Sequence, residues 1–253
     1  MITLSSDFGS PYPAAMKGVI LQRSDARLVD VAHDFPRQDV RAAAFWLREV
    51  LPYFPPAVHL VVVDPGVGTD RAALALRAGD HALVGPDNGV LLPAARELAG
   101  AEGVDAFTVE AGDPESTTFH GRDVFAPAAA TVHEAGIEAF PEREGFAPAD
   151  GVVDLTFPDP TVEADGAHGE VLVVDGFGNA VTNVPGAVLE GTVGASVAVN
   201  GEVAPVRRYY AAVDAGQRLV TVGSHGNVEL AVNQGRGDEA FDVAPGDAVT
   251  IDL

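Results

Sequence analysis

The sequence VHLVVVD at residues 58–64 decides the fold of the first part of the chain. The run is apolar except for His59 and ends at a carboxylate, as expected of a parallel strand that is buried on both faces. Such a strand needs a layer of helices above and below it. Asp64 therefore stands where a buried strand meets a loop.

Strand and helix patterns alternate on both sides of this run. We expect strands at 1–4, 27–31, 72–76, 81–85 and 107–110, and helices at 13–22, at 39–50, from the turn at 87–89 through 97, and up to 136 after a loop that starts at 119. Asp123 is placed to cap the last helix and to pair with Arg122. The alternation predicts an α/β domain over residues 1–152, with a mixed, mainly parallel sheet flanked by helices.

The pattern changes after about residue 150. Residues 148–160 are rich in Pro, Asp and Gly, and we place a linker at 153–165. Short strands are expected beyond it at 169–174, 193–199, 219–222, 227–232 and 248–253, with no long helical pattern among them. The sequence therefore predicts a second domain over residues 166–253, which is all-β and barrel-like.

Composition excludes several classes of protein. No run approaches the ~20 apolar residues of a membrane helix and no secretory signal is evident, so we expect a cytoplasmic protein without membrane contact. The absence of cysteine excludes disulfides, thiolate metal sites and cysteine nucleophiles. The formal net charge is −22, and Lys17 is the one lysine. Such a charge argues against nucleic-acid binding, and it favours adaptation to high salt over an ordinary acidic protein.

Two glycine-bearing segments of the first domain carry groups that can handle water. DPGVGTDR at 64–71 offers Asp64 and Arg71, and TFHGRD at 118–123 offers His120 beside a glycine. Held together, an Asp, an Arg and a His can orient and polarise a water molecule. The alternative for the first segment is a structural turn, and a phosphate loop does not fit because no Gly-Lys-Ser/Thr follows.

His120, Asp123 and His133 are the residues to consider as metal ligands. Their spacing matches no zincin-type pattern, and His133 falls on a helical stretch. We therefore expect no metal site.

Other polar positions suit a nucleoside. Asp7 follows the first strand, where one carboxylate can accept both hydroxyls of a ribose or can cap the following turn. In the second domain, Phe177 offers a ring for base stacking and Asn179 a donor and an acceptor for an adenine edge; a β-turn with a packed ring is the alternative. The segments 223–226 and 233–235 suit the polar end of a ligand, or they are ordinary hairpin turns.

Taken in order, these segments resemble the S-adenosyl-L-methionine (SAM) hydroxide adenosyltransferase family, relatives of enzymes that halogenate SAM. The resemblance covers nearly the whole chain and is carried by residues 6–9, 16–18, 63–68, 85–89, 119–123, 175–183 and 224–235. Each motif alone is weak, and their order is the specific signal.

The resemblance implies an α/β domain, a C-terminal β-barrel and a homotrimer with sites at subunit interfaces. The implied reaction is attack of water or hydroxide on the 5′-carbon of SAM, which releases methionine and leaves adenosine; SAM is the substrate and no cofactor is needed. Asp64, Arg71 and His120 match the catalytic residues of the family. The matched substrate-binding residues are Asp7 at the ribose, Phe177 and Asn179 at the adenine, Asp175 and Ser224 at the methionine end, and Asn233 and Gln234.

The chemistry needs an activated nucleophile, because the sulfonium leaves as a neutral thioether while free water has a pKa of about 15.7. Arg71 can stabilise developing hydroxide, with either His120 or Asp64 as the proton acceptor. A SAM-dependent halogenase, a non-catalytic SAM binder and a metal-dependent hydrolase are the alternatives. The intact Asp-Arg-His set and the short stretch 76–85 favour hydrolysis, and His225 stands where halogenating relatives carry an arginine.

Overall fold

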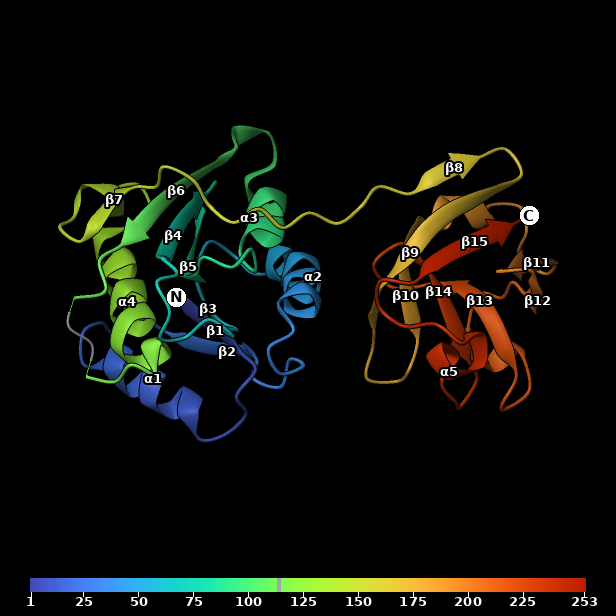
Figure 1. The fold of residues 1–253 in the computed structure, drawn as a ribbon, viewed down its shortest axis with the longest axis horizontal. Coiled ribbons are helices and arrows are strands. Elements are labelled where there is room, and N and C mark those ends of the chain that lie inside the picture. The colour runs from blue at the N-terminus through green and yellow to red at the C-terminus, as the bar shows by residue number, and fades with distance from the viewer. Residues whose placement is uncertain (113–114) are drawn as a thin grey trace. The chain divides into compact units, whose positions relative to one another are not determined.

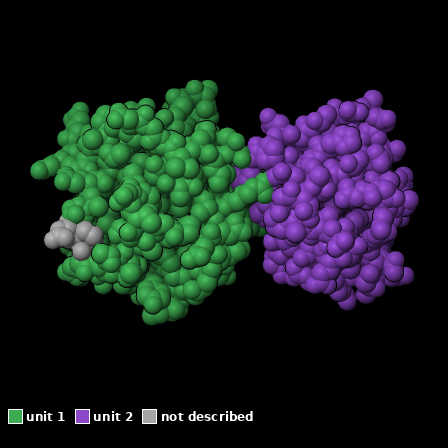
Figure 2. All heavy atoms as spheres, in the orientation of Figure 1, with its two compact units in different colours: residues 1–156 green, residues 157–253 purple. Residues whose placement is uncertain are grey.

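The computed structural model describes residues 1–112 and 115–253 and divides into two compact units, 1–156 and 157–253 (Figure 2). Each unit has its own sheet and its own hydrophobic core. The fold class expected from the sequence, an α/β domain followed by an all-β barrel-like domain, is confirmed.

Unit 1 is built on a seven-stranded mixed sheet in the order β2-β1-β3-β5-β4-β6-β7 (Figure 1). The bounds are β1 Ile2–Ser6, β2 Leu28–Ala32, β3 Val58–Val62, β4 Ala73–Ala78, β5 His81–Pro86, β6 Val104–Val109 and β7 Phe146–Pro148. The first four strands in this order, β2, β1, β3 and β5, run parallel to one another. The next three, β4, β6 and β7, each pair antiparallel with the strand before them. The buried run at 58–64 thus forms a central strand, and the parallel half of the sheet directs the ends of β1 and β3 to the same edge.

Helices cover both faces of this sheet, with α1 packed beside α4 and α2 packed beside α3 (Figure 1). Their bounds are α1 Tyr12–Leu21, α2 Val40–Val50, α3 Leu92–Ala99 and α4 Ala126–Ala135. Because side chains alternate along a strand, Leu60 and Val62 join the core that contains Met16 of α1 and Phe125 before α4. In the described part of the chain no helix is both long and apolar enough to cross a membrane, and the longest, α2, has 11 residues.

The segment that carries His120 differs from the expectation at one point. Gly121–Phe125 forms a π-helical turn, η3, which leads into α4, and neither element has a side-chain cap. Asp123 lies inside this turn, accepts a hydrogen bond from the Ser116 N–H at 2.9 Å and pairs with Arg122 at 2.8 Å. The predicted ion pair is therefore confirmed, whereas the predicted cap is wrong, because the wide turn begins earlier and leaves the Asp123 carboxylate facing the preceding loop.

Unit 2 is an antiparallel barrel-like sheet in the order β12-β11-β15-β9-β10-β14-β13, with β8 paired to β9. The bounds are β8 Thr161–Glu163, β9 Gly166–Val174, β10 Ala180–Pro185, β11 Ser196–Val199, β12 Glu202–Pro205, β13 Arg218–Val222, β14 Asn227–Val232 and β15 Ala248–Asp252, with the short helix α5 at Gly237–Phe241. A bridge between Val206 and Val220 links the two end strands, so the sheet is nearly closed. The sequence did not predict β8, β10 or β12; β10 and β12 each end at a proline, which is disfavoured within a sheet.

Short 3₁₀ helices occupy several of the connections. They lie at Leu51–Tyr53, Gly100–Glu102, Phe140–Glu142, Gly186–Leu189 and Tyr210–Ala212. The last of these carries a tyrosine that contributes to the candidate site in unit 2.

Candidate active site

Asp64 projects from the loop that follows β3, and a neighbouring loop holds the end of this strand. The Asn88 side-chain amide donates a hydrogen bond to the Val63 carbonyl at 2.9 Å. Gly85 lies so close to β3 that a Cβ there would stand 2.4 Å from the Val61 oxygen. The glycine and the asparagine of the segment 85–89 therefore fix the position from which Asp64 enters the site.

Arg71 joins Asp64 to His120. Its Nε donates to Asp64 Oδ1 at 2.8 Å, and its Nη2 donates both to Asp64 Oδ2 and to His120 Nδ1, the latter at 3.1 Å. The guanidinium also lies over the Phe125 ring, 4.9 Å from its centroid. The side chains of Arg71 and Asp64 are only 11% and 5% exposed, so this fork is held in a largely dry environment.

These contacts decide which nitrogen of His120 carries its proton. A guanidinium can only donate, so His120 Nδ1 must accept from Arg71. A neutral imidazole in this place therefore carries its hydrogen on Nε2 and offers a donor there. The Asp64 oxygens, in contrast, retain lone pairs beyond those that Arg71 uses. In this cluster Asp64 is thus the acceptor and His120 the donor.

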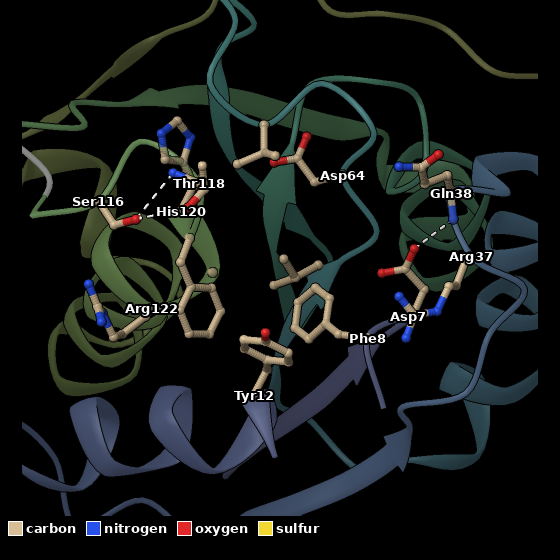
Figure 3. Close-up of a pocket in the computed structure, with 14 residues that line it drawn as sticks. Asp7, Phe8, Tyr12, Arg37, Gln38, Asp64, Ser116, Thr118, His120 and Arg122 are labelled. Atoms are coloured by element: carbon tan, nitrogen blue, oxygen red, sulfur yellow. Dashed lines mark hydrogen bonds between the residues drawn. The ribbon is translucent and has the colours of Figure 1, made fainter. Parts of the chain in front are cut away.

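A cavity of about 700 Å³ opens beside this cluster, and both Asp64 and His120 line it (Figure 3). Arg71 is not among the described residues that line the cavity. One wall is aromatic: Phe8, Tyr12 and Phe119 pack edge to face, with centroids 5.5 to 6.2 Å apart. The cavity therefore combines a polar end with an apolar wall, as small-molecule sites do.

Asp7 lines the same cavity and comes from the end of β1 (Figure 3). Its side chain is buried, and its Oδ2 accepts a hydrogen bond from the Gln38 N–H at 2.7 Å. One such bond uses one of about four lone-pair sites of a carboxylate, so Asp7 has capacity for two ligand hydroxyls. The structure thus brings Asp7 to the cavity that Asp64 and His120 line.

The other predicted site residues lie in unit 2, where Asp175 organises the turn at 175–179. Asp175 Oδ1 accepts from the Phe177 N–H at 2.9 Å and from the Asn179 N–H at 2.8 Å, while its Oδ2 accepts from the Asn179 side-chain amide at 2.9 Å. The Phe177 ring is left 82% exposed. Because Asp175 binds the amide nitrogen of Asn179, the Asn179 Oδ1 is directed away as an acceptor.

Two residues that the sequence did not single out complete this group. Tyr210 lies 3.4 Å from the Asn179 amide and donates to Glu229 Oε2 at 2.9 Å. Glu229 is 6% exposed on β14, and burial raises the pKa of its carboxyl. Burial, followed by the charge of Glu229, also raises the pKa of Tyr210. The one available signal was a glutamate within the apolar strand NVELAV at 227–232.

The last three predicted residues are not bonded to this group. Ser224 is exposed in the turn between β13 and β14, and Gln234 is exposed with φ 58° just after β14. The Asn233 side-chain amide donates to the Val213 carbonyl at 2.7 Å and so fastens a loop.

The residues considered as metal ligands have other contacts. His133 Nε2 accepts from the amino group of Met1 at 2.8 Å, and its Nδ1 lies 3.1 Å from Ser24 Oγ. Within residues 1–112 and 115–253, no three His, Asp or Glu side chains are arranged to hold a metal ion.

Comparison with known proteins gives one family for the whole chain. The profile of the SAM hydroxide adenosyltransferase N-terminal domain matches residues 2–141, and that of the C-terminal domain matches residues 169–250. A Salinispora tropica protein named (R)-S-adenosyl-L-methionine hydrolase is 42% identical, covering 99% of this chain and 97% of its own length. A Thermus thermophilus protein of the same name is 42% identical and covers 95% of each chain.

Two solved structures are similar over the full length. An uncharacterised conserved protein from Thermotoga maritima aligns over 100% of both chains with a TM-score of 0.84 and 33% identity. A conserved hypothetical protein from Thermus thermophilus covers 99% of this chain and 98% of its own, with a TM-score of 0.78 and 40% identity.

Proposed function

The chain belongs to the SAM hydroxide adenosyltransferase family, and on that premise we propose that Asp64, Arg71 and His120 activate the water with which it hydrolyses SAM. The protein is a SAM hydrolase whose products are adenosine and L-methionine. The observation that carries the proposed mechanism is the Arg71 fork, which joins a carboxylate and an imidazole at the polar end of the cavity.

The proposed roles follow from the direction of the hydrogen bonds. His120, with its hydrogen on Nε2, donates to the oxygen of the attacking water, and Asp64 accepts one of the hydrogens of that water. Arg71 holds both side chains in place and keeps positive charge near the developing hydroxide. Asp64 is therefore the proposed base, and holding the water in line with the carbon–sulfur bond supplies much of the remaining rate.

The bond changes balance without a further reactant. The water oxygen forms a bond to C5′ while the C5′–S bond breaks, and sulfur keeps the electron pair as methionine leaves uncharged. As the O–C5′ bond forms, the water gives one proton to Asp64, which yields adenosine. The aromatic wall of Phe8, Tyr12 and Phe119 suits the positive sulfonium before this step, because ring faces attract cations.

The remaining residues are proposed to bind the substrate. Asp7 accepts the ribose hydroxyls, Phe177 stacks on the adenine, and the Asn179 Oδ1 accepts from its amino group. Asp175 and Ser224 are assigned to the amino and carboxylate groups at the methionine end, and Asn233 and Gln234 to other polar groups of the substrate.

The test is incubation of the purified protein with SAM in concentrated KCl, followed by chromatography and mass spectrometry of the products. Adenosine and methionine, with ¹⁸O from labelled water in the 5′-hydroxyl, are expected. Formation of 5′-chloro-5′-deoxyadenosine would instead identify a halogenase, and absence of turnover would leave a binding protein. Separate assays of the two sulfur diastereomers test whether the (R) form, named for the relatives, is the substrate here.

We further propose a cytoplasmic homotrimer in which residues from different copies contribute to one site. Sedimentation measures the assembly. Asp64→Asn and Asp175→Ala variants, each inactive, are expected to regain activity when their subunits are exchanged, and no recovery would contradict shared sites.

A further inference from the structure

A chain of four side chains links the surface of α1 to the residue before Asp7. Ser6 Oγ lies 2.7 Å from His33 Nδ1, and His33 Nε2 lies 3.0 Å from Asp30 Oδ1. Asp30 Oδ2 accepts from Lys17 Nζ at 2.6 Å. Lys17 is the one lysine among 15 basic residues, and neither it nor His33 has a role in the mechanism above. We call these four residues the His33 chain.

For a neutral imidazole at His33, the Asp30 carboxylate sets the direction of each hydrogen bond in the His33 chain. The carboxylate of Asp30 can only accept, so His33 carries its hydrogen on Nε2. His33 Nδ1 then accepts the hydroxyl hydrogen of Ser6. Burial raises the pKa of Asp30, but the hydrogen bonds from Lys17 and His33 outweigh it and hold that pKa below its ordinary value. The Ser6 hydroxyl is therefore held in one orientation.

The loop at residues 33–38, which carries His33, holds the segment around Asp7 at two further points. The Gly9 N–H donates to the His33 carbonyl at 2.8 Å, with Gly9 in the left-handed region at φ 65°. The Gln38 N–H donates to Asp7 Oδ2 at 2.7 Å. Residues 33–38 thus bond to the residue before Asp7, to Asp7 itself and to the second residue after it.

We propose that His33 is a positioning residue, which acts through Ser6 to orient the Asp7 carboxylate towards the hydroxyls of a ribose. Lys17 and Asp30 keep the imidazole in the tautomer that this requires. Ser6 is 0% exposed, so it orients the backbone and does not itself touch a ligand. The inference rests on the proposed role of Asp7. It adds the residues that make this carboxylate selective for a ligand with ribose hydroxyls.

Two substitutions separate the two bonds that His33 makes. The oxygen of an asparagine occupies roughly the place of Nδ1, so His33→Asn keeps an acceptor for Ser6 and loses Asp30. The amide nitrogen of a glutamine reaches roughly the place of Nε2, so His33→Gln keeps Asp30 and loses Ser6. Both replacements are neutral amides, which makes them matched controls for each other.

The assay is calorimetric binding of adenosine and of 2′,3′-dideoxyadenosine to the full-length protein, reported as the ratio of the two Kd values. We expect the wild type to favour adenosine by about tenfold or more, since hydrogen bonds to a charged carboxylate are strong. Asp7→Asn gives the reference ratio without the carboxylate. The Kd ratio of His33→Gln is expected to fall to that reference. The Kd ratio of His33→Asn is expected to stay within about twofold of the wild-type ratio.

Melting temperatures and turnover are measured on the same samples. If His33→Gln weakens both nucleosides equally, or keeps the wild-type ratio while Asp7→Asn loses it, His33 has no positioning role and the inference fails alone. A wild type that turns over SAM but does not discriminate between the nucleosides overturns both the inference and the proposed role of Asp7. A protein without turnover, whose binding ratios still follow the expected order, contradicts the proposed function and supports the inference.

Discussion

His59 is expected to make the stability of unit 1 depend on pH. It is fully buried in β3, its Nδ1 lies 2.7 Å from Thr3 Oγ1, and its Nε2 lies 2.9 Å from His81 Nδ1. Burial, with a smaller contribution from the charge of His81, lowers the pKa of His59 from 6.5 to about 3. The folded state therefore keeps this imidazole neutral across the range in which the unfolded chain binds a proton.

The sign and size of the effect follow from linkage. Above about pH 6.5 neither state is protonated at this residue, and the full stability is present. As the pH falls from about 6.5 towards about 3, only the unfolded state gains a proton, and stability is lost. The loss between pH 7 and pH 5 is about 2 kcal/mol, with an upper limit of ~5 kcal/mol at lower pH. For a domain of this size that corresponds to a fall in Tm of about 4–8 °C by pH 5.

The comparison is between the wild type and His59→Gln, which keeps a polar group near His81 but cannot titrate in this range. Trp46, the one tryptophan of the chain, lies in α2 and reports the unfolding of unit 1 by fluorescence. His168→Gln, which removes an exposed imidazole in unit 2, is the matched control. The His59→Gln curve is expected to be flatter by about 2 kcal/mol between pH 7 and pH 5.

Equal slopes for the wild type and His59→Gln would refute the reasoning. They would mean that the imidazole becomes protonated in the folded state at little cost. A residual slope in the variant is expected, since burial also lowers the pKa of His81.

Changes at the site are expected to act on turnover, on stability or on neither. Arg71→Lys should lower kcat by about 100-fold, because an ammonium cannot both form the fork to Asp64 and reach His120. The rate of adenosine release measures this change. A rate within about threefold of the wild type would contradict the proposed role of the Arg71 fork. Asp64→Asn should lose turnover by a similar factor while the Kd for adenosine stays nearly constant in calorimetry, and a parallel loss of binding would argue against its role as base. Gly121→Ala should cost about 1–3 kcal/mol in a denaturant titration, because the new Cβ would lie 2.9 Å from Met16 Sδ; an unchanged midpoint would mean that this packing yields easily. Dialysis against EDTA should leave the rate of SAM hydrolysis unchanged. A loss of activity that added Zn²⁺ reverses would favour the metal-dependent hydrolase.

Local sequence signals were sufficient for most elements of unit 1 and for the candidate residues that lie in it. The apolar run at 58–64 predicts its strand because burial on both faces shows directly in composition. Asp7, Asp64, Arg71 and His120 stand beside glycines or strand ends, which are features that span only a few residues. The same reasoning failed for Asp123, whose partner Ser116 comes from the loop before the turn and not from the helix itself.

The sequence by itself determined the two fold classes, the order of the motifs and the residue types available for the reaction. Only the tertiary structure decided which hydrogen-bond partners hold those groups: Arg71 reaches His120 across 49 positions, and His33 reaches Ser6 across 27. The physical reason is that periodicity and turn chemistry are local, whereas a hydrogen-bond partner depends on which strand ends the parallel sheet places side by side. The same sheet buries His59 against His81 and so determines how the stability of unit 1 responds to acid.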